Sequence, residues 1–313
     1  MSQTQPSASL QARAIATLWR LLSHRSPATL WRLARWIGPL VYRFSRRERR
    51  VTQINLREVL PDCDPRRRQA LGHASLVHST ATMLELGFAW LAKPERVSAS
   101  ILAVHGRELL DEVRAEGRGV IVLAPHFGNW EVLNFWLSSH FPFTAMYEPP
   151  KIAALDALIR HGRERMGASL VPTNSRGVAS LLKALKRSEA VGILPDQEPD
   201  WRGGVFADFY HRPAYTATLL PKLVARTQAR VVVGVAKRCI EGGRSQGFEI
   251  HFLAADPRVY DSDEAISARG VNASVEAAIA LEPAQYQWEY KRYRKTPEQA
   301  QGHPHYKRFR LYR

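Results

Sequence analysis

Strand-like and helix-like segments alternate through the central and C-terminal parts of this chain. Short apolar runs bounded by turn residues are separated by longer segments whose apolar residues recur at helical spacing. The runs that predict strands are 120–124, 143–147, 169–171, 190–194, 230–235 and, at a sheet edge, 248–253. The segments that predict helices start near Gly128 and cover 152–166, 178–186 and 215–227. This alternation is typical of an α/β fold, so we expect a mixed sheet flanked by helices.

A histidine follows one of these apolar runs directly. The run 120–124 stops at Pro125, and the next helix is expected to begin near Gly128, so His126 lies between a strand end and a helix start. Functional sites in α/β folds gather beyond the carboxyl ends of the strands. Glu131 falls five residues later, in the first turn of the expected helix. This segment is therefore the main candidate for a functional site.

The pairing of His126 with Glu131 predicts proton-transfer chemistry. The positive end of the helix dipole disfavours an imidazolium and leaves a ring that can accept a proton. Glu131 would reach back to the other ring nitrogen and fix its tautomer, and the dyad would act as a general base toward a hydroxyl. A purely structural interpretation stays open. A histidine beside an apolar strand often only packs, and the dipole alone favours an acidic residue in the first turn.

Composition limits the partners of such a site. The 313 residues can bury a large core, and 45 basic against 29 acidic side chains give a net charge of +16. An excess of this size favours anionic partners such as nucleic acid, acidic lipid headgroups or an acidic carrier protein. Two cysteines are too few for a disulfide framework and indicate a reducing compartment.

Other chemistry has little support in the sequence. There is no Gly-x-Ser-x-Gly elbow, P-loop or Cys-x-x-Cys pair, and Cys63 lies between two aspartates that disfavour a thiolate. His303 and His305 are a weak metal signal in a segment that we expect to be a solvated tail. His73 and His78 fall in a segment that predicts a helix, where a structural role is expected. We therefore expect neither a metal nor a cofactor.

The first fifty residues are both basic and apolar. Leucines and tryptophans alternate with arginines from Leu10 to Phe44, so the uninterrupted apolar stretch of about 18 residues that marks a spanning helix is missing. Pro27 predicts a break between two short helices. We interpret residues 1–50 as a basic amphipathic membrane-associating segment and 51–313 as the catalytic domain. A tilted single span and a solvated basic face remain alternatives.

Several ordered motifs resemble those of one family, the bacterial lipid A biosynthesis acyltransferases, which are late acyltransferases related to the lysophospholipid acyltransferase superfamily. The resemblance covers about Leu33 to Arg294. The motifs that carry it are Pro125–Glu131 with its His-x4-Glu spacing, Gly162–Arg165, Leu194–Gln197, Val205–Tyr210 ahead of Pro213 and Thr216, and Gln285–Trp288.

This resemblance implies transfer of a fatty acyl group from acyl carrier protein, or from coenzyme A, to a hydroxyl of a lipid A precursor at the cytoplasmic face of the bacterial inner membrane. It implies that His126 is the base and Glu131 its orienting partner. The residues that it places near substrate are Arg163, Arg165, Asp196, Gly128 and Asn129. One departure is Glu148, where we expect a basic residue, and this puts a phosphate contact at that position in doubt.

The chemistry suits these residues on independent grounds. A positioned base accelerates attack by a hydroxyl, and a thioester is already activated, so no covalent enzyme intermediate is required. The developing oxyanion needs donors, for which backbone N–H groups near Gly128 or an arginine are candidates. Two other hypotheses stay open. The acceptor could be a lysophospholipid or another glycolipid, or the chain could be a basic nucleic-acid-binding protein, although no nucleic-acid-binding motif supports this.

Overall fold

The computed structural model describes residues 9–312, so residues 1–8 of the segment predicted to meet a membrane lie outside the described part. The helices are α1 (Leu10–Ser23), α2 (Pro27–Phe44), α3 (Arg46–Val59), α4 (Pro65–Leu91), α5 (Pro94–Ser98), α6 (Glu108–Ala115), α7 (Trp130–His140), α8 (Asp156–Glu164), α9 (Ser175–Lys186), α10 (Leu219–Thr227), α11 (Glu264–Ala280) and α12 (Pro297–Ala300). The strands are β1 (Ile101–His105), β2 (Val120–Leu123), β3 (Phe143–Tyr147), β4 (Ser169–Pro172), β5 (Ala190–Ile193), β6 (Gly204–Phe209), β7 (Arg212–Ala217), β8 (Arg230–Glu241) and β9 (Arg244–Ala254).

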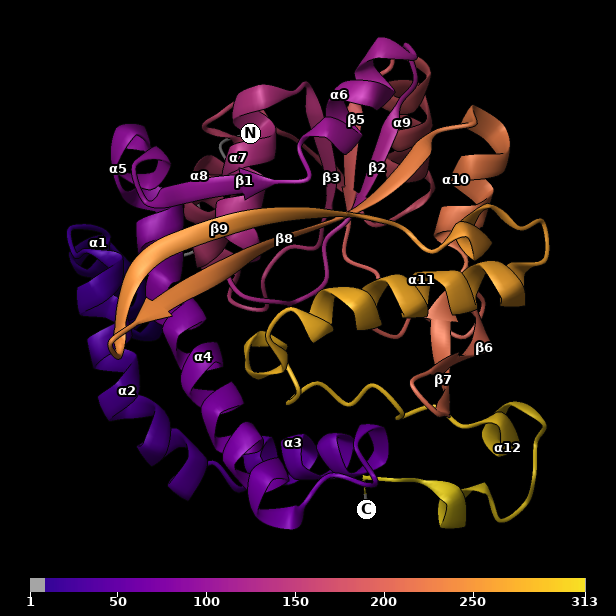
Figure 1. Ribbon diagram of the computed structural model, residues 1–313, viewed down its shortest axis with the longest axis horizontal. Helices are drawn as coiled ribbons and strands as arrows, with labels where there is room; N and C mark the ends of the chain where they lie inside the picture. Colours follow the sequence, from indigo (N-terminus) through magenta and orange to yellow (C-terminus); the bar gives the residue numbers. More distant parts are fainter. Residues whose placement is uncertain (1–8, 313) are drawn as a thin grey trace, which may run out of the picture.

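The centre of the fold is a seven-stranded mixed sheet in the order β1-β9-β8-β2-β5-β3-β4. Only the β8–β9 pair is antiparallel, and this hairpin extends well beyond the other strands (Figure 1). Helices pack on both faces, and β2, which is buried throughout, contributes Val122 to one core and Ile121 to the other. The predicted α/β class with a mixed, helix-flanked sheet is confirmed.

Two details of the sheet differ from the sequence prediction. The 248–253 segment is not at an edge, because β1 pairs with β9 on its outer side. The helix expected over 215–227 starts only at Leu219, since Tyr215 and Thr216 belong to β7 and pair with Phe206 and Val205 of β6. Aromatic and β-branched side chains favour such a hairpin, which overrides the helical spacing.

The N-terminal helices pack directly on the catalytic part of the chain. Pro27 begins α2, as predicted, and the break after α1 lets both helices lie against α4 along one flank of the molecule (Figure 1). Gly38 allows α2 to approach α4 closely, because a β-carbon at this position would lie 2.7 Å from Val77 Cα. Ala12 and Leu30 are part of the same core as β2. In the described part of the chain, the helices lack the combination of length and apolar character needed to cross a bilayer.

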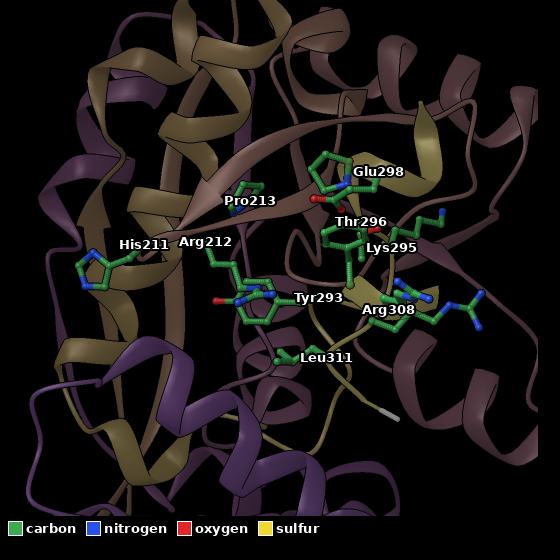
Figure 2. Close-up of a pocket in the computed structure, with 12 residues that line it drawn as sticks. His211, Arg212, Pro213, Tyr293, Lys295, Thr296, Glu298, Arg308 and Leu311 are labelled. Atoms are coloured by element: carbon green, nitrogen blue, oxygen red, sulfur yellow. The ribbon is translucent and has the colours of Figure 1, made fainter. Parts of the chain in front are cut away.

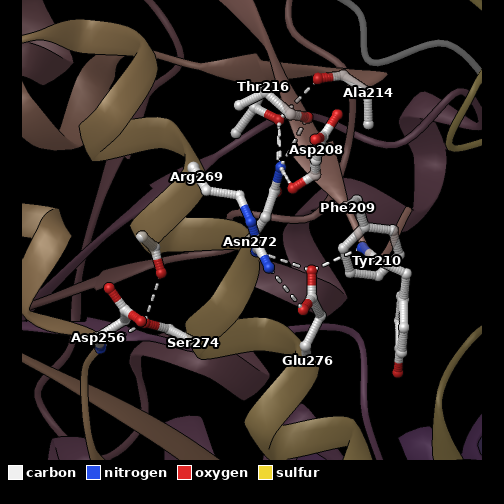
Figure 3. Close-up of polar contacts among 12 residues, drawn as sticks. Asp208, Phe209, Tyr210, Ala214, Thr216, Asp256, Arg269, Asn272, Ser274 and Glu276 are labelled. Carbon is white, nitrogen blue, oxygen red and sulfur yellow. Dashed lines mark hydrogen bonds and ion pairs between the residues drawn. The ribbon is translucent and has the colours of Figure 1, made fainter. Parts of the chain in front are cut away.

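Polar side chains join α11 to the small β6–β7 sheet. Asn272 donates hydrogen bonds to the carbonyls of Ala207 and Asp208 and to the Thr216 hydroxyl, while Glu276 accepts from the Tyr210 N–H (Figure 3). Because these groups are largely buried, each missing bond would cost about 1–3 kcal/mol. The network thus fixes the hairpin against the main sheet.

Candidate active site

A cavity of about 400 Å³ opens at the carboxyl ends of β2 and β5. Its polar rim contains His126, Gln197 and Arg163. The remaining lining is mostly apolar and includes Leu133, Leu137, Phe143, Ala145, Leu170 and Gly192. A cavity with a few converging polar groups above an apolar interior is the usual form of a small-molecule site.

The ring of His126 is held by Asp196. Its Nδ1 lies 2.8 Å from Asp196 Oδ1, and its backbone N–H donates to Oδ2 of the same carboxylate at 2.9 Å. Burial opposes ionisation of Asp196, but the charge and hydrogen bonds of His126 outweigh burial and lower the pKa of that carboxyl below its usual value. An ionised carboxylate only accepts hydrogen bonds, so Nδ1 is the donor to Asp196, and in the neutral imidazole the lone pair is on Nε2.

The expected contact between Glu131 and the His126 ring is not made. Both Glu131 oxygens accept from Arg163 Nε at 3.0 Å, Arg163 Nη2 also donates to this carboxylate, and Trp90 Nε1 donates to Oε2 at 2.8 Å. The helical direction of α7 from Trp130 onward carries Glu131 toward α8 and α4 instead of back toward the loop. The imidazole and this carboxylate therefore belong to two separate polar pairs.

The Glu131–Arg163 pair is buried beside the cavity. The Glu131 side chain is 1% exposed and that of Arg163 24% exposed. Burial disfavours the charged guanidinium, yet the charge and hydrogen bonds of Glu131 raise the pKa of Arg163 above its usual value. The guanidinium also lies 5.4 Å from the Tyr147 ring and 5.9 Å from the Trp90 ring, which hold it in one orientation.

The loop before α7 has little freedom. Gly128 has φ +56°, and a β-carbon there would lie 2.0 Å from the Ala236 carbonyl oxygen, so only glycine fits. Asn129 caps α7 by accepting from the N–H groups of Glu131 and Val132, and its own amide donates to buried Glu85 at 3.0 Å. These two predicted site residues shape the loop, and neither lines the cavity.

The backbone N–H groups near Gly128, expected as oxyanion donors, are already engaged. Gly128 N–H donates to Gln285 and Asn129 N–H to Ala236, both at 2.9 Å. A side-chain donor inside the cavity comes instead from the residue after Asp196. The Gln197 amide lies 3.2 Å from His126 Nε2, and Gln197 lines the cavity. The one sequence signal for Gln197 was its position next to Pro195 and Asp196.

Arg165 and Glu148, two residues that the sequence singled out, have partners of their own. Arg165 is outside the cavity lining, and its guanidinium donates to the carbonyls of Ala89 and Ala92 at the end of α4, so it braces α4 against α8. Glu148 lines the cavity and accepts from the Thr173 hydroxyl at 2.8 Å. An acidic side chain at this wall repels a phosphate, so the doubt that the sequence raised about a phosphate contact here still stands.

A second cavity, of about 650 Å³, lies between the β6–β7 hairpin and the C-terminal segment (Figure 2). Two of its basic side chains already have partners. Arg212 pairs with Glu58, and the Lys295 ammonium lies 4.6 Å from the Tyr215 ring centre. None of the predicted site residues lines this cavity.

The fold and the first cavity define an α/β enzyme with a histidine–aspartate pair at the rim of an apolar pocket. Residues 7–295 match the bacterial lipid A biosynthesis acyltransferases, and the chain belongs to this family. It is therefore an acyltransferase of lipid A biosynthesis. This membership favours the enzyme hypothesis over the nucleic-acid-binding hypothesis.

Characterised relatives cover most of the chain at modest identity. The lipid A biosynthesis lauroyltransferase of Escherichia coli (strain K12) is 26% identical over 284 residues, or 91% of each chain. The palmitoleoyltransferase of the same strain is 25% identical over 83% of each chain. Its myristoyltransferase is 26% identical over 88% of this chain and 84% of its own length. These names describe different acyl chains, so similarity alone does not assign one here.

Proposed function

We propose that the enzyme transfers a fatty acyl group from acyl carrier protein to a hydroxyl of a lipid A precursor, with His126 as the general base. The observation that carries this proposal is the Nδ1 hydrogen bond of His126 to Asp196, at the rim of an apolar cavity. In the neutral ring this bond makes Nε2 the basic nitrogen, next to the space where an acyl thioester would lie. The three named relatives transfer acyl groups of different kinds, which supports the reaction class.

The proposed reaction has two steps. His126 Nε2 takes the proton of the acceptor hydroxyl while the hydroxyl oxygen bonds to the thioester carbonyl carbon. The tetrahedral intermediate then collapses, the C–S bond breaks, and the imidazolium returns its proton to the leaving thiolate. Asp196 stabilises the imidazolium between these steps. Asp196 thus takes the orienting role that the sequence suggested for Glu131.

Gln197 and Arg163 supply the remaining polar functions. In the free enzyme the Gln197 amide donates to His126 Nε2. An incoming hydroxyl would displace it, after which the same amide can donate to the oxyanion. Arg163, held by Glu131 at the cavity wall, would bind an anionic group of the acceptor. The apolar interior between Leu133 and Phe143 would hold the acyl chain.

We place the reaction at a membrane surface. One face of α2 buries Leu30 and Ala34 against α4. On the opposite face, the exposed fraction is 76% for Trp36 and 71% for Phe44. The exposed apolar side chains of this stripe are Leu33, Trp36, Ile37, Leu40 and Phe44. Exposed arginines flank the stripe, as expected for a helix lying among lipid headgroups. Membrane association of residues 1–50 is thus part of the proposal.

The experiment is acyl transfer by purified enzyme in detergent micelles, with acyl carrier protein and coenzyme A thioesters compared as donors. His126→Ala should lower kcat by about 10² to 10⁴-fold with an unchanged melting temperature. His140→Ala, which removes an imidazole at the end of α7 and outside the cavity lining, is the matched control and should retain turnover. Parental activity in His126→Ala would refute the base. Preference for a lysophospholipid acceptor would refute the acceptor assignment.

A further inference from the structure

A cluster of potential metal ligands lies at the outer end of the sheet, on the two adjacent strands β1 and β9. His105 of β1 faces His251 of β9 in the strand register, and Glu249 precedes His251 by two residues on the same face of β9. One donor atom from each of these three side chains falls within 4.8 Å of the others. The two imidazole rings stack with centroids 4.5 Å apart, and His251 Nε2 lies 3.2 Å from Glu249 Oε2.

The geometry points to a divalent metal site, and we propose that His105, Glu249 and His251 bind Zn²⁺. Two imidazole nitrogens and one carboxylate oxygen are a donor set that zinc commonly takes, with water in the fourth position. His105 is exposed while the other two are half-buried, so the cluster can be reached from solvent. This site is independent of the acyl-transfer proposal.

The carboxylate of this cluster already forms an ion pair with a lysine. Lys237, opposite Glu249 across the β8–β9 pair, places its Nζ 3.0 Å from Glu249 Oε2. Both side chains are about one-quarter exposed, so the pair is weak and the ammonium can swing into water. Zinc would replace one cation by another of higher charge. Lys237 is therefore a competitor whose removal should strengthen zinc binding.

Zinc binding would link β1 to β9 and stabilise the edge of the sheet. β1 lies at the edge of the sheet, beside β9 (Figure 1), and its register with β9 shifts between Ile101 and Ala103. A metal shared by His105 and His251 would join the two strands across this irregular pairing. Ligands that bind only the folded state raise its stability by mass action, so zinc should raise the melting temperature.

The test uses the full-length protein freed of metal with a chelator and titrated with zinc chloride by calorimetry, with melting temperature as a second readout. Wild type should bind one equivalent. His105→Ala and His251→Ala should each weaken binding by about tenfold or more. Lys237→Met, which keeps the aliphatic stem, should tighten it. The matched control is the double variant His303→Ala/His305→Ala, which removes two exposed tail imidazoles and should leave the dissociation constant unchanged.

Each outcome decides the proposal. Absence of saturable zinc uptake by wild type would refute it, as would unchanged affinity in both single histidine variants. Loss of binding in the tail variant would assign the zinc to His303 and His305 instead. Melting curves of the zinc-free variants separate a lost ligand from a lost fold. Acyl transfer without zinc should be the same in His105→Ala and wild type, so failure here leaves the acyltransferase proposal untouched.

Discussion

At the scale of single residues, the site consists of two polar pairs with different surroundings. Asp196 accepts two hydrogen bonds from His126, whereas Glu131 is committed to Arg163 and Trp90. The proposed base at the cavity rim and the ion pair in the cavity wall should respond differently to substitution. The two carboxylates are therefore expected to give different kinetic signatures.

Asp196→Asn should impair the chemical step. An amide offers one oxygen where the carboxylate uses two, so either the His126 ring or its backbone N–H loses its partner. We expect kcat to fall by about 10²-fold or more, while KM changes little. Steady-state kinetics on purified protein provide the measurement. A kcat near that of wild type would show that the ring needs no orienting carboxylate.

Glu131→Gln should act through Arg163. Breaking a buried pair leaves the remaining charge without a partner and costs about 3–5 kcal/mol, less here because Arg163 is partly exposed. We expect a lower melting temperature and a raised KM for the acceptor, with a smaller loss of kcat than in His126→Ala. The double variant Glu131→Gln/Arg163→Gln removes the unpaired charge and should recover stability. Equal stability of the single and double variants would contradict this explanation.

At the scale of elements, the length of the apolar cavity depends on how β3 meets β5. Gly192 of β5 lies against Phe143 of β3, and both residues line the cavity. A β-carbon at Gly192 would lie 2.6 Å from Phe143 Cζ, so the ring would have to move. The contact between Gly192 and Phe143 therefore limits the space available for an acyl chain.

Gly192→Ala should shift donor preference toward shorter acyl chains. Each methylene that no longer fits forfeits about 0.8 kcal/mol, roughly a fourfold change in relative kcat/KM per carbon. Phe143→Leu frees space at the same contact and should shift the preference toward longer chains. Competition between acyl donors of graded length measures both effects. Identical chain profiles in both variants would place the end of the acyl site elsewhere.

At the scale of the whole molecule, α1 and α2 link an exposed surface to the catalytic core. Trp19 of α1 meets Trp90 of α4 edge-to-face at 5.1 Å, and Trp90 in turn donates to Glu131. On α2, Trp31 Nε1 and Arg35 Nη1 both donate to the Gly243 carbonyl in the β8–β9 turn. The surface proposed to meet lipid is therefore continuous with the elements that carry the site.

Trp36→Glu should weaken binding to anionic vesicles without lowering the melting temperature, because the Trp36 side chain is largely exposed. Co-sedimentation with vesicles containing acidic phospholipid measures the effect. Ile266→Glu, an exposed residue of α11 at a distance from α2 (Figure 1), is the matched control and should bind as wild type does. Unchanged sedimentation of Trp36→Glu would argue against this orientation on the membrane.

Acid should destabilise the fold through His78. Burial, aided by the charge of Arg238, lowers the pKa of His78 from 6.5 to about 3. Between these values the unfolded chain binds a proton that the native state excludes, so stability is complete above pH 6.5 and declines as the pH falls. The slope from this group is about 1.4 kcal/mol per pH unit.

Urea unfolding at several pH values checks this dependence. His78→Asn keeps an acceptor for Arg238 Nη1 but cannot be protonated, so its stability should fall less between pH 6.5 and 4 than that of wild type. His303→Asn in the exposed tail should retain the wild-type slope. Parallel curves for His78→Asn and wild type would exclude His78 as the cause.

Local pattern and tertiary contact contributed different parts of this structure. The apolar run that forms β2, the Pro27 break and the start of α7 were predictable from sequence, because each depends on residues within a few positions. The short edge strand β1 was missed, since its stability comes from pairing with β9, about 150 residues later. The hairpin that replaced the start of the expected 215–227 helix was missed for the same reason.

The sequence by itself determined the α/β class, the place of His126 at a strand end and, through ordered motifs, the family. Only the tertiary structure decided which carboxylate reaches the imidazole, because Asp196 comes from the next strand of the sheet, 70 residues away, while nearby Glu131 is turned aside by the helix that carries it. Spacing along the chain specifies where a residue lies on its own element, but the packing of elements determines which side chains meet.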